Sequence, residues 1–320
     1  MIDYWQTFGH HQAKKILGKQ LQNDTLSQSY LFLGPEGIGK KMLALELAKK
    51  ILYGSAGSAE SSDIDKDRVN LLRSTFSAPT AVGAPSPRLE RGNIEKLYSH
   101  PDFLMLDLGA EEIPVASALD FLSKIAFKPF VGAKKVAIIN NAENLNLQSG
   151  NALLKTLEEP SESSVIILVA NSRQILPTIM SRCQVLNFSP LDNETLTQFA
   201  QAENLKISPE ILALSFGKIS RLKKLHSDEA YLLSQKMLVE EYRQIAKLSR
   251  GERLLKISEL AEKETDELVR DFIAWLNWQA GELFSQPKEF YRLQVLTDAL
   301  AGLAANFNKK LVLQKLVLKI

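Results

Sequence analysis

The sequence predicts an α/β fold in which a parallel sheet, covered by helices on both faces, precedes a region made of helices only. Three apolar runs, at 30–33, 136–139 and 165–169, are continuous rather than alternating, which is typical of parallel strands buried on both faces. Segments with apolar residues at helical spacing separate these runs. From Asp192 onward the spacing is helical throughout, which indicates a change of domain.

The boundaries of the expected elements follow from breaks in this pattern. The first apolar run stops at Gly34, and Pro160 ends a helical segment, because neither residue favours continuation of a strand or helix. We expect helices over 10–22, 40–52, 115–126 and 147–159, and strands over 30–33, 102–106, 136–139, 165–169 and 185–188.

Length and composition describe a globular protein. The chain has 320 residues, which at roughly 150 residues per domain indicates about two domains. It is 45% hydrophobic with a net charge of +2, so no strong overall field draws it to nucleic acid or a membrane. The single cysteine excludes an internal disulfide and a zinc site of three or four cysteines. No apolar run reaches the ~18 residues of a membrane span, and Met1 to His11 lack a secretory apolar region, so we expect a cytoplasmic protein.

Residues 55–93 differ from the rest of the first domain. Nearly half of them are Ser, Ala, Gly or Pro, a composition that buries little apolar surface. We interpret this stretch as a mobile insertion, and a structured lobe is the alternative.

A phosphate-binding loop follows the first expected strand. Gly34, Gly39 and Lys40 fill required positions of the pattern G-x-x-x-x-G-K-[ST], and Gly37 lies between them, in a segment that follows a strand and opens a helix. Such glycines let backbone N–H groups close around phosphate oxygens at a helix N-terminus. The eighth position, however, is Lys41, whose ammonium cannot ligate Mg²⁺ as a hydroxyl would. ATP or ADP binding and an empty loop both stay open, and no cofactor is required.

The acidic groups of a hydrolytic site are also missing. Asn140 and Asn141 follow the strand at 136–139, where a phosphate-loop NTPase keeps carboxylates for Mg²⁺ and for water activation. Glu143 is nearby, and we interpret it as a solvated carboxylate that caps a helix. Asn171 ends the next strand, where it either faces a phosphate or forms a turn. We therefore predict a phosphate loop without hydrolytic activity and without a bound metal.

Several longer motifs occur in a defined order. They are His-Pro-Asp-Phe at 100–103, Lys-Val-Ala-Ile-Ile at 135–139, Asn-Ala-Leu-Leu-Lys-Thr-Leu-Glu-Glu-Pro at 151–160 and Leu-Pro-Thr-Ile-Met-Ser-Arg-Cys-Gln at 176–184. With these motifs the chain resembles bacterial clamp loaders of the AAA+ class. The resemblance covers roughly 5–53 and 98–225. Because the magnesium-binding groups are absent, the chain is most similar to the delta-prime subunits of the DNA polymerase III loader.

The resemblance gives Arg182 a role. In this family the arginine of Ser-Arg-Cys points out of its own subunit toward the ATP of a neighbour. A guanidinium there would stabilise the charge that develops on the transferred phosphoryl group. An ordinary surface ion pair is the alternative interpretation of Arg182.

The resemblance also implies an architecture and partners. It implies an AAA+ phosphate-loop domain over 1–189, a helical lid over 190–227 and an all-α collar, which joins subunits into a ring, over 228–320. A simple helical bundle is the alternative for the last region. The implied partners are the gamma/tau ATPase subunits, the delta subunit, the sliding clamp and primer–template DNA.

Two features depart from the family or have weak signals. Loader subunits usually carry a four-cysteine zinc module in the interval 54–99, but this interval has no cysteine, so we expect no zinc. Arg221 begins an expected lid helix and is a weak candidate for a second phosphate sensor; a solvated helix charge is favoured. We interpret Cys183 as a small buried thiol. An ATP-hydrolysing loader subunit and a stand-alone nucleic-acid-binding module are the alternative functions.

Overall fold

The computed structural model describes residues 5–54, 96–109, 111–265, 269, 290–304 and 307–319. The chain divides into two compact units, Met1–Leu191 and Asp192–Ile320. The insertion expected at 55–93 lies outside the described residues. The finer division of the second unit into a lid and a collar stays a prediction.

The first unit is built on a five-stranded sheet in the order β2-β3-β4-β1-β5, with every pairing parallel. The central strand β1 lies between β4 and β5, and its Tyr30 is opposite Ile167 and Gln184. The strands are β1 Ser29–Leu33, β2 Phe103–Leu106, β3 Lys135–Asn140, β4 Ser164–Ala170 and β5 Gln184–Asn187.

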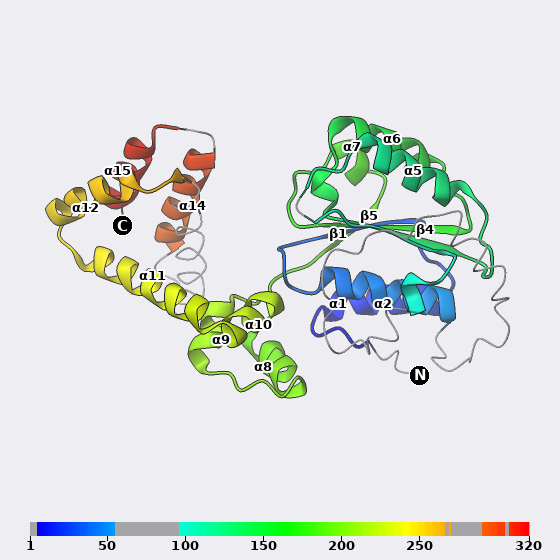
Figure 1. Ribbon diagram of the computed structural model, residues 1–320, viewed down its shortest axis with the longest axis horizontal. Coiled ribbons are helices and arrows are strands. Elements are labelled where there is room, and N and C mark those ends of the chain that lie inside the picture. Colours follow the sequence, from blue (N-terminus) through cyan, green and yellow to red (C-terminus); the bar gives the residue numbers. More distant parts are fainter. Residues whose placement is uncertain are drawn as a thin grey trace. The chain divides into compact units, whose positions relative to one another are not determined.

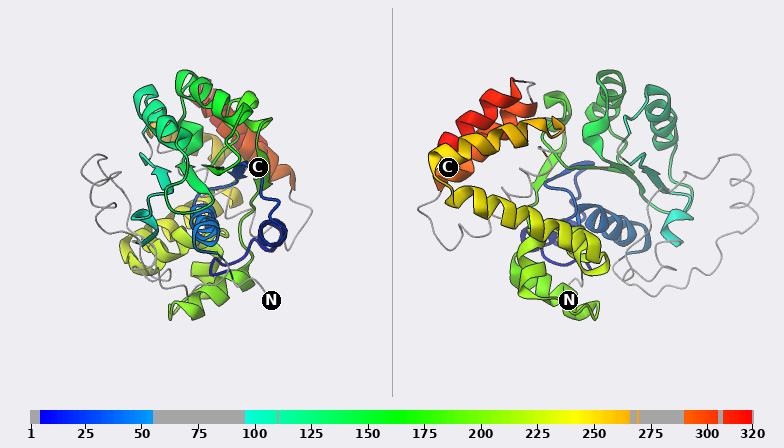
Figure 2. Two further views of the ribbon diagram at one scale, coloured as in Figure 1. Left: turned by 90° about the vertical axis from the view of Figure 1, so that its right-hand side faces the viewer. Right: turned by 60° about the vertical axis from the view of Figure 1, so that its left-hand side comes forward.

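Helices cover both faces of this sheet (Figures 1 and 2). Tyr30 and Phe32 pack into a core with α1 and α2, whereas Leu31 and Leu33 pack into a second core with α5, α6 and α7. This alternation follows from side chains pointing to opposite faces along a strand. The helices are α1 His11–Gln22, α2 Lys40–Tyr53, α5 Val115–Ala126, α6 Leu147–Glu158 and α7 Pro177–Met180.

All nine helices and strands expected before residue 190 are present, and their bounds lie within one residue of the expected ones. The described residues also contain short elements for which no bounds were expected, among them the 3-10 turn η1 at Ala142–Asn144, helix α7 and a helical turn at residues 96–98. The predicted fold class, a parallel phosphate-loop sheet followed in the described residues by helices only, is confirmed.

The His-Pro-Asp-Phe motif has a structural role at the amino end of β2. The carboxylate of Asp102 is fully buried and accepts hydrogen bonds from the backbone N–H groups of Phe130, Val131 and Gly132, at 2.5, 2.9 and 3.0 Å. The Asp102 N–H donates to Nδ1 of His100. Because a buried charge is tolerated only where it is hydrogen-bonded, this arrangement fixes the loop that enters β3.

The second unit consists of helices in the residues described. Some of their N-termini carry side-chain caps: Asp192 accepts from the N–H of Thr195, and Asp228 from that of Tyr231. A separate apolar core joins the last helices through residues such as Leu260, Leu296 and Leu313. The helices are α8 Asn193–Ala202, α9 Pro209–Ser215, α10 Ile219–Ser227, α11 Glu229–Lys247, α12 Arg250–Glu262, α14 Phe290–Ala304 and α15 Lys309–Lys319.

Candidate phosphate-loop site and the Arg182 segment

The polar residues expected at the site gather at one edge of the sheet. In a parallel sheet all strands end on the same side, and ligands bind beyond those ends. The phosphate loop follows β1, Asp107 follows β2, Asn140 ends β3 and Asn171 follows β4. The sheet therefore brings together residues up to 137 positions apart, from Gly34 to Asn171.

The loop has the backbone shape that its glycines predict. Gly37 and Gly39 have φ values of 82° and 105°, in the left-handed region that favours glycine. A Cβ on Gly34 would lie 2.2 Å from the carbonyl oxygen of Phe188, so only glycine fits there. His10, which the sequence did not indicate, supports the loop because its Nε2 lies 2.8 Å from the carbonyl oxygen of Ile38. Burial lowers the pKa of His10.

Lys40 is buried at the start of α2. Its ammonium donates to the carbonyl oxygen of Pro35 at 2.5 Å and to Oδ1 of Asn171 at 3.0 Å. The amide of Asn171 in turn donates to Oδ1 of Asn141 at 2.8 Å. The structure thus places Asn171 against the lysine of the loop and makes it more than a turn residue.

Lys41 makes a contact that the sequence analysis missed. Its ammonium lies 2.6 Å from Oδ2 of Asp107, whose side chain is only 9% exposed. Burial alone would raise the pKa of Asp107. Hydrogen bonds from Lys41 and Asn140, the Lys41 charge and the N–H of Gly109 outweigh burial and lower this pKa. Asp107 is therefore an ionised partner of Lys41 at neutral pH.

The loop suits a phosphate better than it suits a magnesium ion. The positive φ values of Gly37 and Gly39 and the start of α2 directly after them are features of loops that bind a phosphate through backbone N–H groups. For a metal ion the ligands are poor, because the carboxylate of Asp107 is paired with the Lys41 ammonium and Asn140 and Asn141 provide only amides. Among the described residues no group of three or more His, Cys, Asp or Glu is placed to hold a metal. The residues present do not fit Mg²⁺.

The interpretation of Glu143 as a solvated cap is wrong. Glu143 is half-buried, and its carboxylate accepts a hydrogen bond from the N–H of Asn171, 3.1 Å away. Asn141, with a φ of 52°, donates its side-chain amide to the carbonyl oxygen of Gly109. The Glu143 contact ties the end of β3 to that of β4, and the Asn141 contact ties it to the segment after β2, because each backbone group beyond a strand end needs a partner.

Arg182 lies between α7 and β5, and its guanidinium contacts its own domain. One nitrogen is 2.5 Å from Oε1 of Glu158, and the other donates to the carbonyl oxygen of Thr178 at 2.9 Å. The side chains of Arg182 and Glu158 are 33% and 48% exposed. This is the geometry of the surface ion pair, in which water competes for the guanidinium.

A comparison with known families identifies the group to which the chain is related. The family model described as "DNA polymerase III, delta subunit" matches residues 9–67 and 90–192, just over half of the chain. The chain belongs to this family.

Individual relatives in and around this family come from several bacteria. A delta′ subunit of DNA polymerase III from Pseudomonas aeruginosa is 30% identical over 208 residues, covering 62% of this chain and 56% of that protein. The Bacillus subtilis delta′ subunit is 30% identical over 197 residues, with 60% and 52% covered. The Bacillus subtilis tau subunit is 28% identical over 289 residues, with 88% and 46% covered. The chain spans about half the length of the curated relatives it matches.

Within the Ser-Arg-Cys motif of this family member, Cys183 differs from its neighbour Arg182. Its thiol packs against the core that contains α5, α6 and α7. Burial raises the pKa of Cys183 to about 12. The thiol is therefore protonated at neutral pH and is not a nucleophile.

Arg221, the weak candidate for a phosphate sensor, makes its hydrogen bonds within the helical unit. It donates to the carbonyl oxygen of Leu214 at 2.8 Å and to Oε1 of Gln235 at 2.6 Å. Its guanidinium also lies 4.7 Å from the ring centre of Phe216. The interpretation as a solvated helix charge is therefore wrong, because Arg221 links three successive helices.

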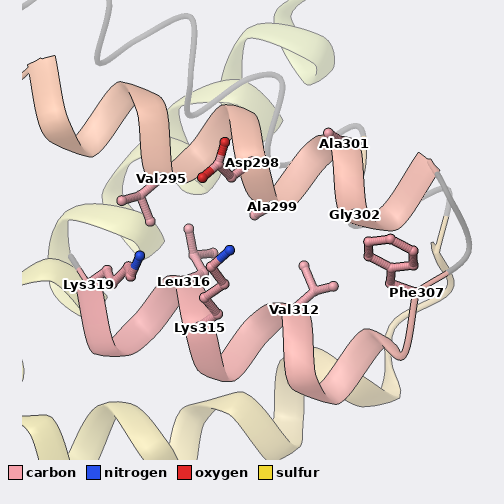
Figure 3. Close-up of a pocket in the computed structure, with 10 residues that line it drawn as sticks. All are labelled: Val295, Asp298, Ala299, Ala301, Gly302, Phe307, Val312, Lys315, Leu316 and Lys319. Carbon is pink, nitrogen blue, oxygen red and sulfur yellow. The ribbon is translucent and has the colours of Figure 1, made fainter.

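A groove in the helical unit contains none of the predicted site residues. It lies between α14 and α15, and Figure 3 shows side chains of both helices pointing into it. Val295, Ala299, Val312 and Leu316 make its apolar lining, and Phe307 lies at one end. No helix in the described parts of the chain is long and apolar enough to cross a membrane.

Proposed function

We propose that the chain is a non-catalytic, delta-prime-like subunit of the DNA polymerase III clamp loader. In this role it assists the ATP-driven loading of the sliding clamp on primer–template DNA, together with gamma/tau ATPase subunits and the delta subunit. Membership of the delta-subunit family supports this assignment. The relatives include both delta′ and tau subunits at similar identity, so the choice between them rests on the site.

The observation that carries the proposal is the ion pair of Lys41 with Asp107 beside two amides. Hydrolysis of a nucleoside triphosphate in a phosphate loop needs a metal on the β and γ phosphates and a group that orients water. Here the hydroxyl is replaced by an ammonium 2.6 Å from Asp107, and Asn140 and Asn141 stand where carboxylates are needed. The loop is preserved in shape while its hydrolytic groups are replaced.

Arg182 is the residue proposed to act on a neighbouring subunit. Its ion pair with Glu158 is solvent-exposed, and pairs of this kind contribute only about 0–1 kcal/mol. The guanidinium can therefore exchange a carboxylate for a phosphate at low cost. Its planar fork contacts two oxygens at once, which suits a transferred phosphoryl group.

Assembly into a ring is proposed for the helices after residue 228. Large apolar side chains are exposed there, including Leu233 and Met237, one turn apart on α11, and Leu255 on α12. Exposed apolar strips of this kind mark subunit contacts in soluble proteins. They favour the collar over a bundle that only caps the monomer.

The first experiment measures ATP turnover by the purified full-length chain with Mg²⁺. We expect no turnover above background. The control is Lys40→Ala, which removes the lysine of the loop. Mg²⁺-dependent turnover that Lys40→Ala abolishes would contradict the proposal and favour the second candidate, an ATP-hydrolysing gamma/tau-like subunit, which the tau match over 88% of the chain supports.

The second experiment tests Arg182 in a loader reconstituted with its ATPase subunits, the clamp and primed DNA. Arg182→Ala should change the free energy of unfolding by no more than about 0.5 kcal/mol. It should lower the stimulated ATPase activity of the complex only by the part that comes from the one ATP site next to this subunit. Arg182→Lys should rescue only partly because an ammonium lacks the planar fork. Arg173→Ala, at an exposed arginine before α7, is the matched control. Wild-type turnover by the Arg182→Ala complex would contradict the assignment.

A further inference from the structure

The end of β2 and the first turn of α2 meet in one polar cluster, formed by Lys41, Asp107 and Asn140. The ammonium of Lys41 donates to Oδ2 of Asp107 at 2.6 Å. The other carboxylate oxygen, Oδ1, accepts from the N–H of Gly109 at 3.2 Å, and the Asn140 side chain is a further hydrogen-bond partner. Both oxygens of Asp107 are thus occupied by donors from the protein.

We propose that the Lys41 ammonium takes the place of the divalent metal ion at this edge of the sheet, with Asp107 as its carboxylate. Position 41 is the place in the motif where a hydroxyl would hold Mg²⁺. The lysine instead brings a positive charge on its own side chain to the strand ends. The charge is covalently attached, so it is present whether or not a nucleotide is bound.

Electrostatics explains why the two cations exclude each other. Asp107 carries one negative charge and is only 9% exposed, so water compensates little of any added charge. A hard divalent cation seeks several oxygen ligands, preferably carboxylates. With Lys41 bound, both oxygens of Asp107 already accept hydrogen bonds and an ammonium repels the incoming ion. Without Lys41, Asp107 keeps its hydrogen bonds from Gly109 and Asn140 but has lost the cation that it pairs with.

Two consequences follow for the loop. The contact joins β2 to the start of α2, so the loop keeps its shape without a metal–nucleotide complex. Any nucleotide that the loop binds is bound without a divalent metal. Asp107 is a latent metal ligand that a single substitution at position 41 would uncover. This inference rests on the same Lys41–Asp107 contact as the proposed non-catalytic role, but its test uses the isolated chain and needs no loader.

The test uses the full chain with ADP as the probe, in EDTA and in excess Mg²⁺, and measures binding by calorimetry and by the shift in melting temperature. Wild-type protein should give the same result in both buffers. Lys41→Thr supplies a hydroxyl and frees Asp107, so its affinity for ADP should rise about tenfold or more when Mg²⁺ is added. Adding Asp107→Asn to Lys41→Thr should remove most of this gain.

Lys41→Met is the matched control, because it keeps the length of the side chain but offers neither charge nor hydroxyl. It should lose the ion pair without gaining the full dependence on Mg²⁺. Lys41→Ser provides a second hydroxyl variant in case Lys41→Thr unfolds. Stronger ADP binding by the wild type in Mg²⁺ would overturn the proposal. Hydroxyl variants with no dependence on Mg²⁺, or a gain in Lys41→Met as large as in Lys41→Thr, would overturn it too.

Discussion

Two ion pairs of the first unit have nearly the same length and different surroundings. Lys41 lies 2.6 Å from Asp107 and Arg182 lies 2.5 Å from Glu158. The Asp107 side chain is 9% exposed, whereas the Glu158 side chain is 48% exposed. The distance between the charged atoms therefore does not distinguish the two pairs, and the burial of the carboxylate does.

This difference in burial makes Lys41 a structural cation and leaves Arg182 able to exchange its partner. Asp107 is held by further hydrogen bonds from Gly109 and Asn140, so Lys41 has a fixed partner inside the strand-end cluster. Glu158 lies at the exposed end of α6, where water competes for the guanidinium of Arg182. Three predictions test how far burial decides these roles, in order of decreasing effect.

The largest effect concerns Cys183, the next residue after Arg182. Burial raises the pKa of its thiol from 9.0 to about 12, so at pH 8 the native thiolate is about a thousand-fold scarcer than in the unfolded chain. Iodoacetamide should alkylate Cys183 correspondingly more slowly in native protein than in urea. If the two alkylation rates lay within about tenfold of each other, Cys183 would be accessible to solvent like Arg182. The two neighbouring residues would then not differ in burial.

The next effect extends the comparison to a fully buried carboxylate. Asp102→Asn removes the charge that three backbone N–H groups contact, and we expect a loss of about 3 kcal/mol in the free energy of unfolding. Asp120→Asn is the matched control, because Asp120 is 63% exposed in a helical pair with Lys124. Urea titrations measure both. Equal losses in the two variants would mean that burial does not set the contribution of a carboxylate here.

The smallest effect is expected for Glu158→Gln. Since this pair is exposed, the free energy of unfolding should change by less than about 0.5 kcal/mol. The same urea titration, with Arg182→Ala beside it, measures the change. A loss of more than about 1.5 kcal/mol would make the Arg182 pair structural and would remove the distinction from Lys41.

Most of the first unit could be predicted from the sequence. Apolar runs such as 136–139 and 165–169 fix the strands because a sheet covered on both faces needs continuous hydrophobicity. No bounds could be given for the short elements η1 and α7 because three or four residues carry no periodicity. The role of Asp102 was also hidden, since its partners are backbone groups at 130–132 that leave no side-chain signal.

The site was predicted in part. The glycines, Lys40 and Asn171 were found because motif spacing and strand ends place them at one edge of the sheet. Asp107 offered a comparable signal, a charge directly after an apolar strand, and it was overlooked. Glu158 offered none, because a pair separated by 24 residues in sequence depends on how α6 packs beside α7. Motif spacing therefore locates a site more readily than it identifies the charges that neutralise it.

The close approach of Gly34 to Phe188 limits what the glycine motif can reveal about enzymatic activity. A side chain at position 34 would collide with the backbone at the end of β5, whatever the loop binds. Gly34 is therefore needed for the close packing of the segments that follow β1 and β5. A protein that lost catalysis would still have to keep this glycine. A motif search that counts this glycine as evidence of nucleotide turnover would misclassify such proteins as enzymes. Residues that are not required by this close backbone approach, such as the one at position 41, are better indicators of nucleotide turnover.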